Sequence, residues 1–352
     1  NLVGLLTAFF WLLSSPPGLF AQSTESKLSW LESLSPRERQ ARLAEAARSE
    51  GEVAAYGNLD VTAAKALSDG FTRKYPAVQA RVVHFSGAAI ITRVESEARA
   101  GKVFSDAILS GQLGMLALLE KKIFARYRSP QREFYPETFK DKEGHWTAFF
   151  TNLMVTSYNK RQVKTEDLPR KLDDLLKPRW TKKLAMDSQS YVWFGAILQY
   201  LGEEAGLRFM KKLNEQNLSH IRGRRLLNQL VAAGEFEIAV ETNLNSVLSF
   251  AGQGAPLWFA PIQPLFLSPS LLFLSQNSPH PHAGALFVDY LLSEGGQRIL
   301  ASTNRMPAHS KVKSGEAQHL EGLDIRMPDV FDIGRRYNAI GKQYREVFPG
   351  AR

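Results

Sequence analysis

The residues that could do covalent chemistry are scattered along the chain instead of being gathered into motifs. The sequence has no GxSxG, HExxH or GxxxxGKS/T pattern, and it has no cysteine to serve as a nucleophile or thiolate ligand. The seven histidines are dispersed except for His280 and His282, which flank a proline at an expected helix start. A turn and a helix cap explain this pair better than a metal site. The sequence therefore predicts a protein that is not an enzyme and has no cofactor.

Polar and small residues recur where expected strands end, which is a pattern typical of ligand binding. Buried strands are predicted over 52–56, 80–85 and 106–110, with amphipathic helices over 61–75 and 88–100 between them. The pattern restarts with strands over 153–158, 184–187 and 236–241 and helices over 195–201 and 226–233. This alternation predicts an α/β protein of two lobes.

Loops beyond the carboxyl ends of strands converge on a crevice in open α/β sheets, and ligands bind there. The candidate loops are residues 57–60, 86–89, 110–112, 188–193 and 242–246. Several run directly into helices, whose N-terminal N–H groups favour an anionic group. The candidate ligand-binding residues are Asn58, Asp60, Ser86, Gly87, Ala88, Ser110, Ser188, Tyr191, Thr242, Asn243 and Asn245.

Each of these candidates also has a structural explanation that the sequence leaves open. Ser86 could contact a ligand or simply cap the following helix. The aromatic residues Tyr191 and Trp193 could stack on an organic ligand or pack between the lobes. Arg222, Arg224 and Arg225 could clamp an anion, but we expect at least two of the three to lie on the surface.

The overall composition argues against a nucleic-acid partner. In 352 residues, 44 Lys and Arg against 35 Asp and Glu give a net charge of +9, yet the basic residues are spread over both halves. No basic run is interleaved with aromatic residues, so we expect no nucleic-acid binding and instead a surface that attracts anionic small molecules. We also expect a monomer.

The first residues predict export. Residues 2–13 are uncharged and apolar, and this run is too short to span a bilayer comfortably. The small residues that follow, up to Ala21, resemble a signal-peptidase cleavage site. Residues 1–21 are therefore interpreted as a cleaved signal peptide, with a retained membrane anchor as the alternative. Without a cysteine there is no site for lipidation, so a periplasmic protein that is not a lipoprotein is predicted. Residues 22–50, with Ser35-Pro36 as a helix start, predict an N-terminal helical segment.

An ordered set of segments carries a family resemblance over residues 51–309. They read EVAAYGNLDVTAAKALSDGFTRKYP, HFSGAAIITRVESEARAGKVFSDAILS, FKDKEGHWTAFFTNLMVTSYNKR, DLPRKLDDLLKPRWTKKLAM, LVAAGEFEIAV and SPHPHAGALFVDYLLSEGGQRIL. In this order the chain resembles an extracellular solute-binding protein of a bacterial ABC importer, in the branch of ferric-iron or family 1 binding proteins.

The resemblance implies a type II periplasmic binding fold that closes like a hinge on a ligand and presents it to an ABC permease and ATPase. Residues 51–151 and 265–318 would form one lobe, and residues 152–264 and 319–352 the other. The chain would cross between lobes near residues 151–158 and return near 261–267.

Iron is where this sequence departs from the branch it resembles. Ferric-binding members offer a histidine, a glutamate and a pair of tyrosines, which fall here on Asp60, Gly111 and Leu244-Asn245. Fe(III) prefers anionic oxygen ligands, and of these positions only Asp60 supplies one. Neutral groups at residues 242–246 instead suit an organic solute that bears a carboxylate, a phosphate or hydroxyls.

The leading hypothesis is thus a periplasmic receptor for a small, anionic organic solute. The alternatives are an Fe(III)-binding protein of an iron importer, a secreted enzyme on the same scaffold, and a sensory solute-binding module.

Overall fold

The computed structural model describes residues 22–85, 89–111, 113–303, 305–313, 315 and 319–351. Its strands are β1 (Glu52–Gly57), β2 (Gln79–His84), β3 (Ala107–Ser110), β4 (Phe124–Ala125), β5 (Trp146–Asn159), β6 (Leu184–Asp187), β7 (Ser219–Ile221), β8 (Ile238–Asn243), β9 (Leu257–Ala260), β10 (Leu265–Ser275), β11 (Met306–Pro307) and β12 (Ile325–Arg326). The predicted signal peptide and the predicted site residues Ser86, Gly87 and Ala88 lie outside the described residues.

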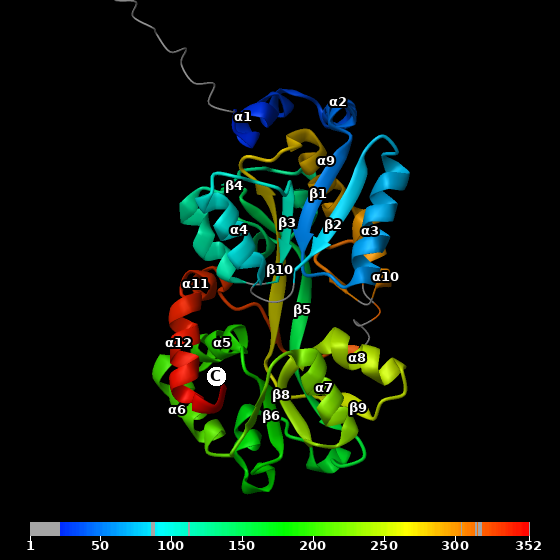
Figure 1. Cartoon of the computed structure of the whole chain (residues 1–352). Coiled ribbons are helices and arrows are strands. Elements are labelled where there is room, and N and C mark those ends of the chain that lie inside the picture. The colour runs from blue at the N-terminus through cyan, green and yellow to red at the C-terminus, as the bar shows by residue number, and fades with distance from the viewer. Residues whose placement is uncertain are drawn as a thin grey trace, which may run out of the picture.

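The helices separate into two groups around these strands. They are α1 (Thr24–Leu28), α2 (Pro36–Glu50), α3 (Val61–Lys74), α4 (Ala89–Arg99), α5 (Tyr191–Leu201), α6 (Glu203–Asn214), α7 (Arg224–Ala233), α8 (Leu244–Gly252), α9 (Pro281–Leu292), α10 (Glu294–Ser302), α11 (Val330–Arg335) and α12 (Tyr337–Val347). The first lobe contains β1 to β4, α2 to α4, α9 and α10, and the second lobe contains β6 to β9 and α5 to α8 (Figure 1).

A single curved sheet runs through both lobes in the order β2-β1-β3-β10-β5-β8-β6-β7. The strands β1, β2 and β3 are parallel to one another, and so are β6, β7 and β8. The long strands β5 and β10 pair antiparallel and join the two halves (Figure 1). The predicted α/β architecture of two lobes is confirmed.

The strand β5 is much longer than the sequence pattern indicated. The prediction covered residues 153–158, whereas β5 spans Trp146–Asn159 and is buried at 13 of its 14 positions. Because both faces of this strand are covered, its apolar run shows no alternation that would mark its ends. Its first half pairs with β10 in the first lobe, and its second half pairs with β8 and β9 in the second.

The N-terminal segment belongs to the core of the first lobe. Ser35 caps α2 in a reciprocal capping box with Glu38, and Gly51 ends the helix with φ +75°, as the sequence predicted. Along α2, the buried Arg39 pairs with Asp289 of α9 at 3.0 Å. Because an unpaired charge in this core would be costly, the pair fixes how α2 lies on α9.

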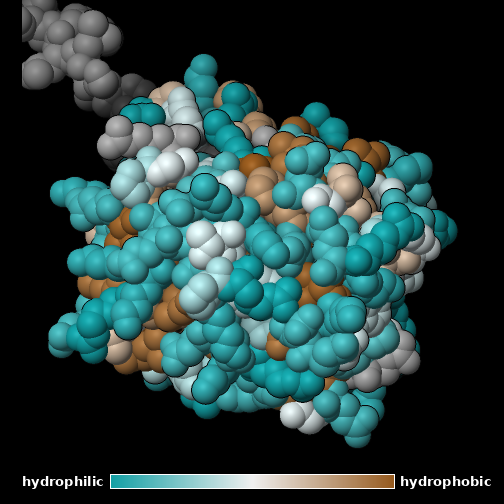
Figure 2. All heavy atoms as spheres, turned by 90° about the horizontal axis from the view of Figure 1, so that it is seen from below, coloured by the Kyte–Doolittle hydropathy of each residue, from teal (hydrophilic) through white to brown (hydrophobic). Residues whose placement is uncertain are grey.

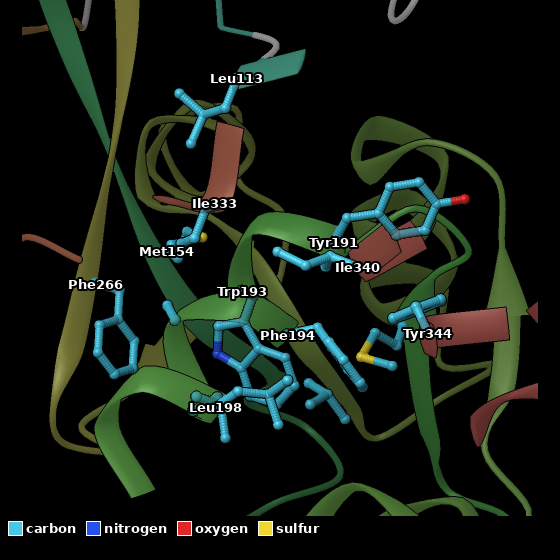
Figure 3. Packing of buried hydrophobic residues seen from close by; sticks show 14 of the residues in the cluster. Leu113, Met154, Tyr191, Trp193, Phe194, Leu198, Phe266, Ile333, Ile340 and Tyr344 are labelled. Carbon is cyan, nitrogen blue, oxygen red and sulfur yellow. The ribbon is translucent and has the colours of Figure 1, made fainter. Parts of the chain in front are cut away.

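The C-terminal helices contact both lobes. The short helix α11 packs against the 3-10 segment Leu113–Lys121 of the first lobe, and α12 packs against α5 and α6 of the second. In Figure 3, Ile333 of α11 and Ile340 and Tyr344 of α12 lie among Leu113, Tyr191 and Phe194. The predicted lobe boundaries, with residues 319–352 in the second lobe, stay a prediction.

Hydrophilic side chains cover most of the end of the second lobe, and the apolar side chains there form separate patches (Figure 2). The exposed large apolar residues of this lobe include Tyr200, Leu201 and Leu226. Among the described residues, no helix is both long enough and apolar enough to span a bilayer.

Candidate functional site

A polar cavity of about 530 Å³ lies between the two lobes. Both lobes and the connecting strands contribute to its walls, and α12 adds one side chain. The lining residues are Asn58, Ala89, Gly111, Asn152, Met154, Asp187, Gln189, Val192, Arg222, Gly223, Arg224, Asn243, Ser268 and Tyr337. This is the cleft that the loop pattern predicted between the lobes.

The cleft is built by the carboxyl ends of parallel strands from both halves of the sheet. Asn58 and Gly111 directly follow β1 and β3 in the first lobe. In the second lobe, Arg222 follows β7 and Asn243 is the last residue of β8. Such an edge gathers side chains that are distant in sequence around one ligand.

Four helices of nine or more residues begin at or beside this cleft. The lining residue Ala89 is the first of α4, Gly223 and Asn243 are the N-caps of α7 and α8, and Gln189 precedes the start of α5. The N-cap residues of α5, α7 and α8 make no side-chain hydrogen bond to their helices. The first N–H group of α5, on Tyr191, instead donates to the Gln189 carbonyl oxygen at 2.7 Å. The first N–H groups of α7 and α8 are not satisfied by a side-chain cap, and they favour a negative charge in this part of the cleft.

One arginine of the cleft is neutralised by two carboxylates. The Arg224 guanidinium donates to both carboxylate oxygens of Glu241, at 2.9 to 3.2 Å, and lies 3.7 Å from Asp187 Oδ2. Glu241 is fully buried and also accepts a 2.6 Å hydrogen bond from Ser190 Oγ. Burial alone would lower the pKa of Arg224, but the two negative charges outweigh it and raise that pKa. We call Arg224, Glu241 and Asp187 the Arg224 cluster.

The other arginines of this segment differ in what they can offer a ligand. Arg222 and Arg225 are exposed, which confirms the expectation that at least two of the three lie on the surface. Arg222 lines the cleft and has no ion-pair partner among the described residues. Arg225 lies 5.8 Å from the Phe250 ring and outside the cleft. Arg222 is thus the cation that an anionic ligand could reach.

Tyr337 brings the C-terminal helix α12 into the cleft. Its ring packs edge-on against Tyr191 with centroids 5.6 Å apart, and a side chain at Gly114 of the first lobe would meet it at 3.0 Å. Burial, with the nearby Tyr191 and Asp187, raises the pKa of Tyr337 to about 12, although Arg224 opposes this. The phenol is therefore neutral at physiological pH and can donate a hydrogen bond.

Of the predicted site residues that the structure describes, Asn58 and Asn243 line the cleft. Asp60 does not, because it caps α3 through Ala63 N at 2.9 Å and pairs with Arg305 at 2.5 Å. Burial alone would raise the pKa of Asp60, but these partners lower it. Its carboxylate is engaged within the first lobe.

The remaining predicted residues pack behind the cleft walls. Ser110 is fully buried, and Thr242 accepts a hydrogen bond from Asn228 in the interior. Tyr191 accepts one from Arg345 at 3.0 Å and packs on Tyr344 of α12. Ser188 and Asn245 also lie outside the lining. Whether any predicted residue binds ligand stays a prediction.

Sequence reasoning missed several residues of the cleft. They are Asn152, Met154, Asp187, Gln189, Val192, Ser268 and Tyr337, and Arg224 was considered without its partners. Gln189 and Val192 lie in the candidate loop 188–193, so closer attention to that loop would have found them. Asn152 and Ser268 are opposite each other on β5 and β10, a pairing that only the sheet register reveals.

Of the positions that the resemblance matched to iron ligands, Asp60 alone has an anionic side chain. Asp60 is paired with Arg305, Gly111 has no side chain, and Leu244 is fully buried at the start of α8. Among the described residues, no group of three or more His, Cys, Asp or Glu side chains is arranged to hold a metal ion. His280 and His282 contact Asp106 and Glu50, at 3.1 and 2.7 Å, where α9 begins.

Two α/β lobes joined by long strands, with a polar cleft between them, define a type II periplasmic binding fold. The chain matches the family described as bacterial extracellular solute-binding protein over residues 108–324. Because this match spans more than half of the chain, the protein belongs to that family.

Individual relatives place it near ferric-iron-binding proteins, as the resemblance indicated. An Fe(3+)-binding periplasmic protein of Serratia marcescens is 23% identical over 274 residues, which is 74% of this chain and 79% of the relative. Apo ferric ion-binding protein A of Pasteurella haemolytica has a TM-score of 0.73 at 18% identity, covering 84% of this chain and 98% of that one.

A further solved structure is the periplasmic binding protein AfuA of Actinobacillus pleuropneumoniae with exogenous fructose-6-phosphate bound. It has a TM-score of 0.74 at 17% identity, covering 85% of this chain and 99% of that one. At these identities the likeness establishes the fold.

Proposed function

We propose that this protein is the periplasmic binding component of an ABC importer and captures a small, anionic organic solute in the cleft between its lobes. The observation that carries the proposal is the meeting, at one cleft, of uncapped helix N-termini with the unpaired Arg222. Backbone N–H groups and a guanidinium are the groups that proteins use to bind carboxylates and phosphates.

The pairing within the Arg224 cluster supports an anionic ligand more than a metal ion. A bare Fe(III) ion would need several anionic oxygens, and the acidic groups at this site, Asp187 and Glu241, already neutralise Arg224. The remaining lining is rich in neutral amides and hydroxyls, which orient an organic ligand without requiring a metal. AfuA, of the same fold, was solved with a sugar phosphate.

The family and the apolar N-terminal residues together support a periplasmic location for this protein. Members of this family are extracellular solute-binding proteins, and residues 1–21 read as an export signal. The binding protein would pass its ligand to a membrane permease driven by an ATPase, and no chemical step on the ligand is needed. The proposed partners are therefore a small molecule, a permease and an ATPase.

Isothermal titration calorimetry on the purified mature chain tests this proposal. Citrate, fructose-6-phosphate, inorganic phosphate and ferric chloride would each be titrated into unliganded protein. Saturable binding of citrate or fructose-6-phosphate, tighter than that of inorganic phosphate, supports the proposal, and it should weaken with ionic strength because the ligand is charged. Binding of ferric ion with no response to any metal-free anion would refute it.

Fe(III) binding is the second candidate, and one observation favours it. The Tyr337 phenol and the Asp187 carboxylate both line the cleft, and they are oxygen groups that could approach a metal. Its signature is a visible charge-transfer band on addition of ferric citrate, because a phenolate bound to Fe(III) absorbs visible light. Loss of that band in Tyr337→Phe would establish this candidate in place of the first.

A further inference from the structure

Among the buried polar side-chain atoms that have no hydrogen-bond partner in the described part of the chain, two lie on the first-lobe side of the cleft. They are Asn58 Oδ1, on the loop after β1, and Ser270 Oγ, on the connecting strand β10. Ser270 is fully buried, and Asn58 itself lines the cleft. Buried polar atoms without partners are costly, so two of them at a binding cleft indicate groups that a ligand is meant to satisfy.

The strand geometry places these atoms on one wall. Side chains two residues apart on a strand share a face, so Ser270 lies on the same face of β10 as Ser268, which lines the cleft. Across the sheet, Ser268 is opposite Asn152 of β5, a second lining residue. This wall therefore runs along the strands that join the lobes.

Gly111 lies between the side chains of Asn58 and Ser270. A side chain at this position would begin 3.3 Å from Asn58 Nδ2 and 4.0 Å from Ser270 Oγ. Gly111 also lines the cleft, so a ligand group beside it would approach the side chains of both Asn58 and Ser270. We call Asn58, Gly111, Asn152, Ser268 and Ser270 the hinge wall.

We propose that the hinge wall recognises hydroxyl groups, so that the solute captured in the cleft is a hydroxylated anion. This inference rests on the proposed function, because it assigns the anionic end of the ligand to Arg222 and the helix N-termini of the second lobe. The hydroxyl-bearing end then faces the first lobe and the connecting strands.

The chemistry of the wall favours hydroxyl groups over carboxylates and apolar groups. Its side chains are two amides and two hydroxyls, with no charge that would balance a second anion or a cation. An unpartnered amide oxygen needs a donor, which an ionised carboxylate lacks and a hydroxyl supplies. An apolar group would leave both buried atoms unsatisfied, and a binding site loses affinity when its polar groups stay unpaired.

Pairs of ligands that differ by one or more hydroxyls provide the test. Affinities of the full mature chain would be measured by calorimetry for malate against succinate, citrate against tricarballylate, and glycerol phosphate against propyl phosphate. In at least one pair the hydroxylated member should bind tenfold or more tightly than its partner, because its hydroxyl replaces the missing hydrogen bonds.

Two variants link that preference to the wall. Ser270→Ala removes a hydroxyl that has no partner among the described residues, so it should leave the thermal midpoint unchanged and cut the preference at least threefold. Gly111→Ala fills the space beside Asn58 and should lower affinity for the hydroxylated member. The control is Gly252→Ala, at a glycine with no neighbour within 4 Å, which should change neither affinity.

The outcomes separate this inference from the function on which it rests. A hydroxyl preference that Ser270→Ala and Gly111→Ala reduce, with the affinity of the partner compound retained, supports the hinge wall. Equal affinity for both members of every pair that binds would overturn it while leaving anion capture intact. Failure of all six compounds to bind would overturn the proposed function and the inference together.

Discussion

Two arginines separated by a single residue have different roles because of where α7 begins. Arg222 stands before the helix, exposed and without an ion-pair partner in the described part of the chain, while Arg224 is the first helical residue and turns its guanidinium to Glu241. The first is available to a ligand, and the second organises the loop around it. Their separation by Gly223, at φ +100°, permits this change of direction.

Arg222→Gln should weaken binding of the anionic ligand by about tenfold or more, since hydrogen bonds to charged groups contribute about 1.5–3 kcal/mol. Calorimetric titration with the strongest anion of the panel measures the effect. Arg225→Gln is the matched control because that arginine is exposed, lies three positions further on and does not line the cleft. An equal loss in both variants would show that only net charge matters.

Glu241→Gln should destabilise the fold by about 3 kcal/mol, because it leaves the Arg224 guanidinium with only the more distant Asp187 as a counter-charge. Urea unfolding followed by circular dichroism measures the change. Glu235→Gln, at an exposed position nearby, should stay within about 0.5 kcal/mol of the wild type. A loss below about 1 kcal/mol in Glu241→Gln would contradict the account of the cluster.

For single residues, the sequence predicted Asn58 and Asn243 because both stand at the ends of strands that the local pattern reveals. It could not find the Arg224 cluster, since Asp187, Arg224 and Glu241 come from three separate elements. Nor could it tell that Asp60 would be occupied by Arg305, a residue 245 positions away. Long-range pairing decides which polar loop residues remain free for a ligand.

Among the elements, β5 and β10 do most to define the cleft. They pass through both lobes and place Asn152 and Ser268 at the junction. Helix starts such as Ser35-Pro36 were predictable because capping is local, whereas the full length of β5 was not. A strand buried on both faces carries no alternation, so its extent depends on its partners in the sheet.

Helix α11 fits closely on the first lobe, and Gly334 is the point of contact. A side chain there would begin 2.6 Å from Leu116 Cδ1 and 2.8 Å from the Leu113 carbonyl oxygen. Gly334→Ala should therefore destabilise the protein by about 2 kcal/mol through overpacking. Chemical unfolding against the control Gly252→Ala measures this, and equal stabilities would show that α11 can shift without cost.

For the whole molecule, the strands that join the lobes imply closure on a ligand. Two lobes connected by β5 and β10 can rotate about the segment around Asn152 and Ser268, where a bound anion would bring both walls together. Saturation with ligand should reduce the radius of gyration in small-angle X-ray scattering. An unchanged radius at saturating ligand would mean that the cleft binds without closure.

Native mass spectrometry distinguishes an organic anion from an iron ion as the ligand of this cleft. The mature protein would be purified without added ligand and weighed under native and denaturing conditions. The account predicts an additional mass of an organic anion that is lost on denaturation. An additional mass of one iron atom, with no organic component, would contradict it and show that groups such as Tyr337 and Asp187 replace the tyrosine pair of the iron-binding relatives.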